Sequence, residues 1–155
     1  MKKTLLGFLA LSTITTASAA NYVGGSIGTG GSIHYQQDRS ATSAMRYSLD
    51  LAATGLSFNN LRVGGSADYL MNIPGQAPSA LTPYYGAGLG AYVSLGAGTG
   101  VGLYPHALLG AKYNVSAPLS IFGEVNAGPY LNLGSATFFS FGWGARLGLN
   151  YQLNN

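Results

Sequence analysis

The stretch Phe138–Leu153 reads FFSFGWGARLGLNYQL. From Phe139 onward every odd-numbered residue is apolar or aromatic, whereas the even-numbered residues are Ser, Gly, Arg, Asn and Gln. Alternation with a period of two predicts a β-strand with one apolar face. The stretch is far longer than the typical soluble strand of about 5–6 residues. It exceeds the roughly 9–11 residues of a transmembrane β-strand, so we expect it to cross a bilayer.

The composition of the chain also favours a membrane barrel. Only 7% of the 155 residues are charged, against about 25% in soluble domains. Glycine and tyrosine are abundant, with 24 and 11 residues, and there is no cysteine. The chain therefore has neither a disulfide framework nor a thiolate metal site. Its length is that of a single domain, and low charge with period-two patterning is typical of an outer-membrane barrel.

The first residues predict a cleaved secretory signal peptide. A basic pair, Lys2 and Lys3, precedes a mostly apolar run that ends in Ala-Ser-Ala at 17–19. We expect residues 1–19 to be removed and residues 20–155 to form the exported barrel domain. Loss of the two lysines takes the formal net charge from +3 to +1, a balance that gives no indication of a nucleic-acid partner.

The same odd-apolar phase recurs in five stretches that precede the one quoted. They are residues 43–54, 60–72, 82–95, 102–114 and 119–132. Bacterial barrels have an even number of strands, so residues 21–37 should supply two short strands, 22–28 and 31–37, joined by a Gly-rich turn. The alternative is one long first strand and a total of seven. We predict an all-β fold, an eight-stranded antiparallel up-and-down transmembrane β-barrel with a polar, filled lumen.

Three prolines lie close to the ends of these predicted strands. They are Pro83, Pro105 and Pro129. A proline removes one ladder hydrogen bond, which costs least at a strand end. We therefore expect all three near strand termini.

The apolar face is predicted to point outward, toward lipid. A soluble lipocalin-like calyx would point it inward, but the few charges could not solvate such an exterior. All strand charges are at even positions, so they should form a lumen charge network. Its members are Arg46, Asp50, Arg62, Asp68, Lys112, Glu124 and Arg146. Side chains just fill the interior of an eight-stranded barrel, so we expect no wide pore.

Odd-numbered aromatic residues cluster toward the two ends of the strands. Barrels carry aromatic girdles at the membrane interfaces, because the ring is apolar and a hydroxyl group needs water. One rim is predicted to hold Tyr47, Tyr69, Tyr85, Tyr113 and Tyr151, and Phe139, Phe141 and Trp143 to hold part of the other.

Hairpin geometry predicts specific charge pairs in the lumen. Residues that face each other across a hairpin have position numbers with a constant sum. The turn near residue 57 then sets Arg46 opposite Asp68, and the turn near residue 135 sets Glu124 opposite Arg146. Opposed side chains on one face have Cβ atoms about 4.5–5.5 Å apart, so we expect both pairs to interact.

The two histidines are the remaining candidates for chemistry. His34 and His106 are at even positions and should hydrogen-bond in the lumen. No His, Asp and Glu set has the spacing of a metal site, and a His-Ser pair on the lipid face, as in lipid-modifying barrels, is absent. We expect no catalytic residues, no metal, no cofactor and no enzyme activity.

Two segments and the final strand resemble a known family. Residues 83–90, PYYGAGLG, and residues 119–125, LSIFGEV, are similar to the small outer-membrane barrels, which include the OmpA transmembrane domain and the OmpX-like and opacity-protein-like barrels. The resemblance implies a place in the outer membrane of a bacterial cell, with membrane lipid and the barrel-assembly machinery as partners.

The resemblance leaves the physiological role open. We expect a structural or surface role without a wide pore, and no particular protein or small-molecule ligand is indicated. An exported soluble binding barrel is the alternative. An adhesin is less favoured, because the predicted loops are short.

Overall fold

The structure is a computed structural model that describes residues 20–53, 60–73, 75, 81–96, 100–134 and 137–153. The predicted signal peptide, residues 1–19, lies outside the described residues. In the described part, no helix is long and apolar enough to cross a membrane.

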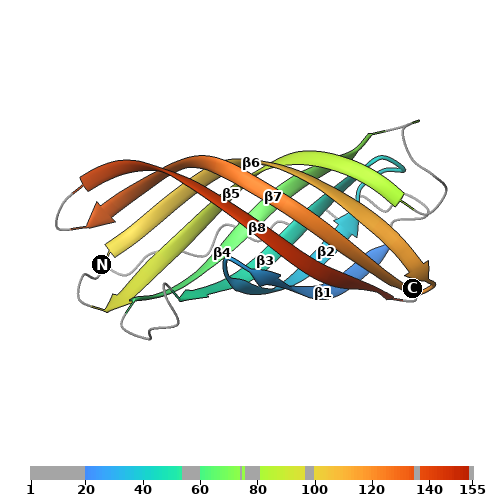
Figure 1. The fold of residues 1–155 in the computed structure, drawn as a ribbon, viewed down its shortest axis with the longest axis horizontal. Coiled ribbons are helices and arrows are strands. Elements are labelled where there is room, and N and C mark those ends of the chain that lie inside the picture. The colour runs from blue at the N-terminus through green and yellow to red at the C-terminus, as the bar shows by residue number, and fades with distance from the viewer. Residues whose placement is uncertain are drawn as a thin grey trace, which may run out of the picture.

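The described chain forms a closed barrel of eight antiparallel strands (Figure 1). The strands are β1 (Asn21–Gly28), β2 (Gly31–Asp38), β3 (Ser43–Ala53), β4 (Asn60–Asn72), β5 (Leu81–Gly96), β6 (Gly100–Ser116), β7 (Leu119–Gly134) and β8 (Thr137–Leu153). Each strand pairs with the next, and β1 closes the barrel against β8. The predicted fold class is confirmed, as are the two short strands at the start.

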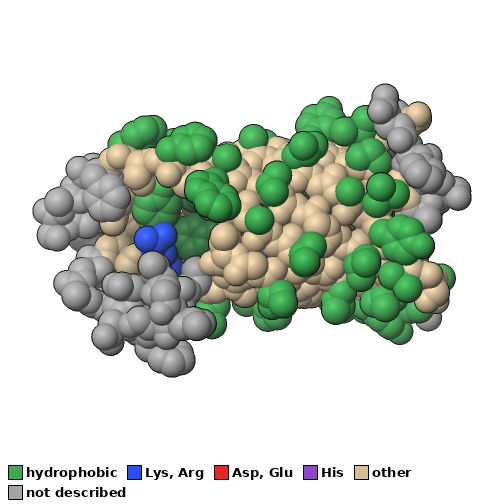
Figure 2. Space-filling model, viewed as in Figure 1, with side chains coloured by type: hydrophobic (Ala, Val, Ile, Leu, Met, Phe, Trp, Pro, Cys, Tyr) green, Lys and Arg blue, Asp and Glu red, His purple; other side chains and the backbone are tan. Residues whose placement is uncertain are grey.

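A single side-chain phase runs through all eight strands. Every exposed large hydrophobic residue of the described chain has an odd number, and every buried residue has an even number. The registers explain this continuity, because each hairpin pairs odd with odd and even with even along almost its whole length. Apolar side chains accordingly cover much of the outer surface of the barrel (Figure 2), and the buried polar side chains lie in its lumen.

The expectation that all three prolines lie near strand ends is wrong for two of them. Pro83 is the third residue of β5, but Pro105 and Pro129 lie inside β6 and β7, which extend beyond their predicted limits. The β6–β7 pairing is interrupted between Leu103↔Leu131 and Ala107↔Ala127. In this register Pro105 faces Pro129. The two missing N–H groups thus fall in the same interval of one ladder, which confines the loss of hydrogen bonds to a single place.

The hairpin β1–β2 is much shorter than the wall around it. Pairing of β1 with β8 stops at Gly28↔Arg146, followed by a bond from Thr29 N–H to the Ala145 carbonyl oxygen at 3.0 Å. Pairing of β2 with β3 starts at Gly31↔Leu51. Among the described residues, no strand therefore lies between the far part of β8 and the end of β3. We call this opening the side gap. Figure 1 shows the blue hairpin ending near mid-barrel, while β5–β8 continue to the left.

The two ends of the barrel therefore differ. We call the end where β1 begins and β8 finishes the terminal end, and the end that carries the side gap the open end. On the face seen in Figure 2, a hollow toward the open end exposes Lys or Arg side-chain atoms between hydrophobic groups.

Candidate functional site

Four charged side chains meet in the lumen. Arg46 donates to Oδ2 of Asp68 from Nε at 3.2 Å and from Nη2 at 3.0 Å, and Nη2 also donates to Oε2 of Glu124 at 2.7 Å. Arg146 donates from Nε to Oε1 of Glu124 at 2.7 Å and from Nη2 to Oδ2 of Asp68 at 3.2 Å. Each arginine thus bridges both carboxylates. We call these four residues the ion ring.

The ion ring joins strands from opposite sides of the barrel. The registers place Arg46 opposite Asp68 on β3–β4 and Glu124 opposite Arg146 on β7–β8, as predicted. The links from Arg46 to Glu124 and from Arg146 to Asp68 each join residues 78 positions apart. Hairpin arithmetic could not predict these cross-lumen links, because they depend on how the barrel closes.

His106 and Tyr84 complete the shell around the carboxylates. Nε2 of His106 lies 3.1 Å from Oδ1 of Asp68, and Nδ1 lies 3.0 Å from the Tyr104 carbonyl oxygen. The Tyr84 hydroxyl donates to Oε2 of Glu124 at 2.9 Å. Both carboxylates are therefore held from several sides, which a buried charge requires.

Gly88 makes the contact between Asp68 and His106 possible. The three residues lie in one row across β4, β5 and β6. A Cβ atom on Gly88 would lie 2.1 Å from Oδ1 of Asp68 and 2.8 Å from Nε2 of His106. The missing side chain lets the two residues meet across the strand that separates them.

His34 has the expected lumen hydrogen bond. Its Nε2 lies 2.6 Å from Oδ1 of Asn150, and its ring packs edge-on against Phe122. The ring of Phe122 also lies 5.4 Å below the guanidinium carbon of Arg46. His34 and His106 thus each have a hydrogen-bond partner within the lumen, as predicted.

Three predicted members of the charge network stand apart from the ion ring. Asp50 accepts a hydrogen bond from Ser66 at 2.8 Å. Arg62 lies over the Tyr130 ring, with 5.3 Å from its guanidinium carbon to the ring centroid. Lys112 lies over the Tyr22 ring at 5.7 Å. The predicted network therefore consists of the ion ring and three charged residues that make no ion pair with it.

The lumen also contains an apolar layer that the alternation did not predict. Ala44, Leu70, Tyr84 and Leu108 are buried together. Leu70 is apolar at an even position, which is an exception in the sequence pattern, and the structure places its side chain in this layer. The layer lies next to the ion ring, since Ala44 and Arg46 are consecutive lumen residues of β3. The apolar layer and the ion ring thus lie at neighbouring levels of the lumen.

Aromatic side chains in the lumen pack over glycines of neighbouring strands. Tyr84 faces Gly110, and a Cβ there would lie 2.6 Å from the tyrosine Cζ. Phe122 faces Gly148, where a Cβ would lie 2.4 Å from the ring. These close approaches explain why glycine is so frequent at even positions. Each aromatic ring occupies the space that a side chain on the facing residue would need.

The predicted girdle residues are all exposed on the outer surface. Tyr47, Tyr69, Tyr85, Tyr113 and Tyr151 project toward the terminal end, whereas Phe139, Phe141 and Trp143 project toward the open end. Tyr35 belongs with the first group, since it faces Tyr47 on the neighbouring strand. Its odd number and its place near the end of β2 would have identified it from the sequence.

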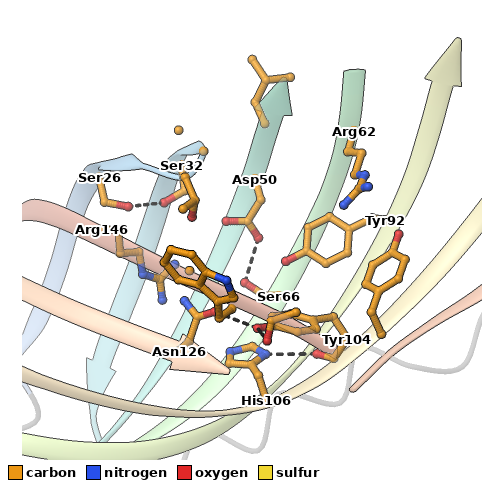
Figure 3. Close-up of a pocket in the computed structure, with 18 of the residues that line it drawn as sticks. Ser26, Ser32, Asp50, Arg62, Ser66, Tyr92, Tyr104, His106, Asn126 and Arg146 are labelled. Carbon is orange, nitrogen blue, oxygen red and sulfur yellow. Dashed lines mark hydrogen bonds between the residues drawn. The ribbon is translucent and has the colours of Figure 1, made fainter. Parts of the chain in front are cut away.

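A pocket of about 420 Å³ lies above the ion ring, toward the open end. Figure 3 shows Asp50 and Arg62 projecting into it together with Tyr92, Tyr104 and His106. Tyr104 stacks on His106, with ring centroids 4.8 Å apart. Arg146 of the ion ring lines this pocket as well, so the ring forms part of its floor.

These features define a narrow barrel that is apolar outside and carries its charged side chains inside. Three solved structures share this fold. The N-terminal β-barrel domain of Pseudomonas aeruginosa OprF has a TM-score of 0.58 and 14% identity, covering 87% of this chain and 96% of the other. Neisserial surface protein A has a TM-score of 0.56 and 16% identity, with 87% and 94% covered.

A major outer membrane protein from Thermus thermophilus has a TM-score of 0.54 and 14% identity, with 88% of this chain and 100% of the other covered. No family model matches the sequence, and no curated protein matches it either. The expected resemblance to small outer-membrane barrels is confirmed as a likeness of fold.

Proposed function

We propose that this chain is a small integral outer-membrane β-barrel protein of a bacterial cell, with a non-enzymatic structural or surface role and no wide pore. In this proposal residues 1–19 direct export, the barrel-assembly machinery inserts the chain, and lipid surrounds its outer face. One observation carries the proposal. The large hydrophobic side chains point outward on every strand, while four charges bridge one another inside.

The height of the apolar surface supports membrane insertion. Trp143 and Tyr151 lie eight residues apart on the outer face of β8. At about 3.3 Å per residue and a tilt near 40°, they are about 20 Å apart along the barrel axis. Outer-membrane barrels carry an apolar band of about 25 Å between aromatic girdles. The axial distance between Trp143 and Tyr151 is therefore close to the distance between the two membrane interfaces.

A soluble lipocalin-like barrel would need the opposite arrangement. Its ligand cavity would be lined by the apolar residues, and its charges would face water. Here Trp143 is 75% exposed and Leu147 69%, whereas Asp68 is 0% exposed and Arg46 2%. This distribution favours a bilayer over water as the surroundings of the barrel.

Fractionation and planar-bilayer recording test the proposal. The protein should stay with membranes after a high-salt wash and show heat-modifiable gel mobility. Because the ion ring and the apolar layer obstruct the lumen, purified protein should give little or no stable conductance. Release by salt would contradict membrane insertion, and steady porin-sized steps would contradict the closed lumen.

A further inference from the structure

The contacts of His106 show that it shares one proton with Asp68. Nδ1 of His106 lies 3.0 Å from the Tyr104 carbonyl oxygen, which can only accept a hydrogen bond, so Nδ1 carries a hydrogen. Nε2 lies 3.1 Å from Oδ1 of Asp68, and two atoms without a hydrogen between them would repel each other at this distance. A second hydrogen therefore lies between Nε2 and Oδ1. Whether it belongs to the imidazole or to the carboxyl group, the two residues together carry no net charge.

This proton leaves the ion ring and His106 together with one excess positive charge. Arg46 and Arg146 each contribute a positive charge and Glu124 a negative one, while Asp68 and His106 together contribute none. All of these residues except Arg146 are buried, and the Arg146 side chain is 13% exposed. A buried charge is costly unless an opposite charge balances it, so the excess favours a negative charge above the ring.

The acidic residues of the chain do not balance both this excess and Arg62. The sequence has four acidic residues, and the structure describes all of them. Two belong to the ion ring, and Asp38 lies at the terminal end, where Tyr22 donates to it. Asp50, which accepts a hydrogen bond from Ser66, is then the single carboxylate at the pocket. It stands against two positive charges, the excess of the ring and Arg62, so the pocket carries a net charge of +1.

Arg62 offers a ligand a complete set of unused hydrogen-bond donors. The residue lines the pocket and is exposed, so solvent reaches it. Among the described residues it makes no ion pair and no hydrogen bond, and its guanidinium carbon lies 5.3 Å from the centroid of the Tyr130 ring. In Figure 3, Arg62 and Arg146 lie on opposite sides of the pocket.

Tyr92 adds a hydroxyl group close to Arg62. Tyr92 of β5 faces Gly64 of β4, and Arg62 is two residues from Gly64 on the same face. Such diagonal neighbours have Cα atoms about 7–8 Å apart, within reach of long side chains. In the described part of the chain the Tyr92 hydroxyl has no hydrogen-bond partner, although it belongs to the pocket lining.

The chemistry of these groups matches a small monocarboxylate with an apolar body. A planar guanidinium group can hold both oxygens of a carboxylate at once, and one negative charge balances the net charge of the pocket. The volume of about 420 Å³ is far larger than a single inorganic ion and lies within the roughly 300–1,000 Å³ of small-molecule sites. The rings of Tyr92, Tyr104 and Tyr130 in the lining provide apolar surface for the body of the ligand.

We propose that the open-end pocket binds a small monocarboxylate with an apolar or aromatic body. The carboxylate pairs with Arg62 and accepts a hydrogen bond from Tyr92, while the body lies against Tyr104 and Tyr130. The excess charge of the ion ring attracts the ligand, and Asp50 opposes its binding. This binding site goes beyond the structural or surface role proposed above.

Calorimetric titration with benzoate tests the site. The full-length barrel in dodecyl maltoside micelles is titrated with benzoate, with neutral benzamide and cationic benzylammonium as matched controls. Saturable binding of one benzoate per protein is expected. Benzamide should bind about tenfold more weakly, because hydrogen bonds to charged groups are stronger by this order, and benzylammonium should not bind. Equal affinities for benzoate and benzamide, or no saturable binding of benzoate, would overturn the proposal.

Three variants change the charge of the pocket in known directions. Arg62→Gln removes the guanidinium group and should weaken benzoate binding about tenfold. His106→Gln can still donate to Asp68 but carries no charge, so it should weaken binding about three- to tenfold. Asp50→Asn can still accept from Ser66 and should tighten binding by a similar factor, because it removes the opposing charge.

The controls keep the outcome decisive. Arg39→Gln removes a positive charge outside the pocket and should leave the affinity for benzoate unchanged. Weaker binding by Asp50→Asn than by the native chain would overturn the proposal, as would unchanged binding by folded His106→Gln. Heat-modifiable gel mobility shows which variants are folded, and if His106→Gln is not, Arg62→Gln and Asp50→Asn decide. A native chain with heat-modifiable mobility but no benzoate binding rejects the carboxylate site alone, whereas loss of that mobility rejects the membrane barrel.

Discussion

The middle of the barrel and its open end are built from the same alternating strands, yet they differ in what they hold. In the middle, all eight strands surround the ion ring, and Asp68 has no exposed surface. At the open end the wall lacks β1 and β2, and Asp50 and Arg62 line a pocket with no ionic partner among the described residues. The charges that link opposite strands thus lie where all eight strands are present, whereas Asp50 faces Ser32 near the end of the β2–β3 pairing and Arg62 lies beyond it.

Replacement of the two lumen aspartates should give the largest contrast. Asp68→Ala leaves Arg46, Arg146 and His106 without their shared acceptor, and loss of one partner from a buried ion pair costs about 3–5 kcal/mol. Asp50→Ala, the matched change at the open end, removes one hydrogen bond to Ser66 and should cost about 1 kcal/mol. Urea unfolding in lipid vesicles measures both. Equal losses of unfolding free energy would show that Asp68 contributes no more to stability than Asp50.

The cost of an arginine on the outer face of β8 should depend on its depth in the bilayer. Leu147 lies midway between Trp143 and Tyr151, and Leu147→Arg is expected to cost about 2–4 kcal/mol at the bilayer centre. Phe139→Arg, on the same face beyond Trp143, should cost about 0–1 kcal/mol. The free energy of unfolding in lipid vesicles distinguishes the two.

Leu147→Phe serves as the control for lipid contact at the same position. Acyl chains should accommodate the larger ring with little loss, whereas a packed protein core would lose about 1–3 kcal/mol. Equal damage from Leu147→Arg and Leu147→Phe would contradict a lipid-facing Leu147.

Two glycines give the smallest contrast. A Cβ on Gly88 would intrude between Asp68 and His106, so Gly88→Ala should cost about 1–3 kcal/mol. A Cβ on Gly31, at the base of the side gap, would meet nothing closer than the Leu51 carbonyl oxygen at 3.9 Å, so Gly31→Ala should stay within about 0.5 kcal/mol. Unfolding midpoints in urea test the pair. A Gly88→Ala variant as stable as Gly31→Ala would mean that the Asp68–His106 contact can relax.

Much of this architecture could be predicted because its causes are local. Alternation along each strand decides which side chains face out. Because the hairpins pair odd-numbered residues with odd-numbered ones, the outward-facing residues are odd-numbered on all eight strands. Leu147 and Tyr151 could thus be placed outside, and Arg46 could be placed opposite Asp68 from the position of one turn. Tyr35 follows the same rule, although the prediction omitted it.

The sequence by itself determined six of the eight strands, the outward apolar face and the charge pairs within hairpins, since each depends on residues close in the chain. The structure decided that residues 21–38 form two strands and not one. Only the tertiary structure decided that Arg46 reaches Glu124 and Arg146 reaches Asp68, because closure of the barrel brings β3 and β4 to face β7 and β8 across the lumen. It also decided that Pro105 faces Pro129 and that the β1–β2 hairpin ends short of the neighbouring strands. These features depend on the relative heights and registers of strands distant in sequence, which no alternation pattern records.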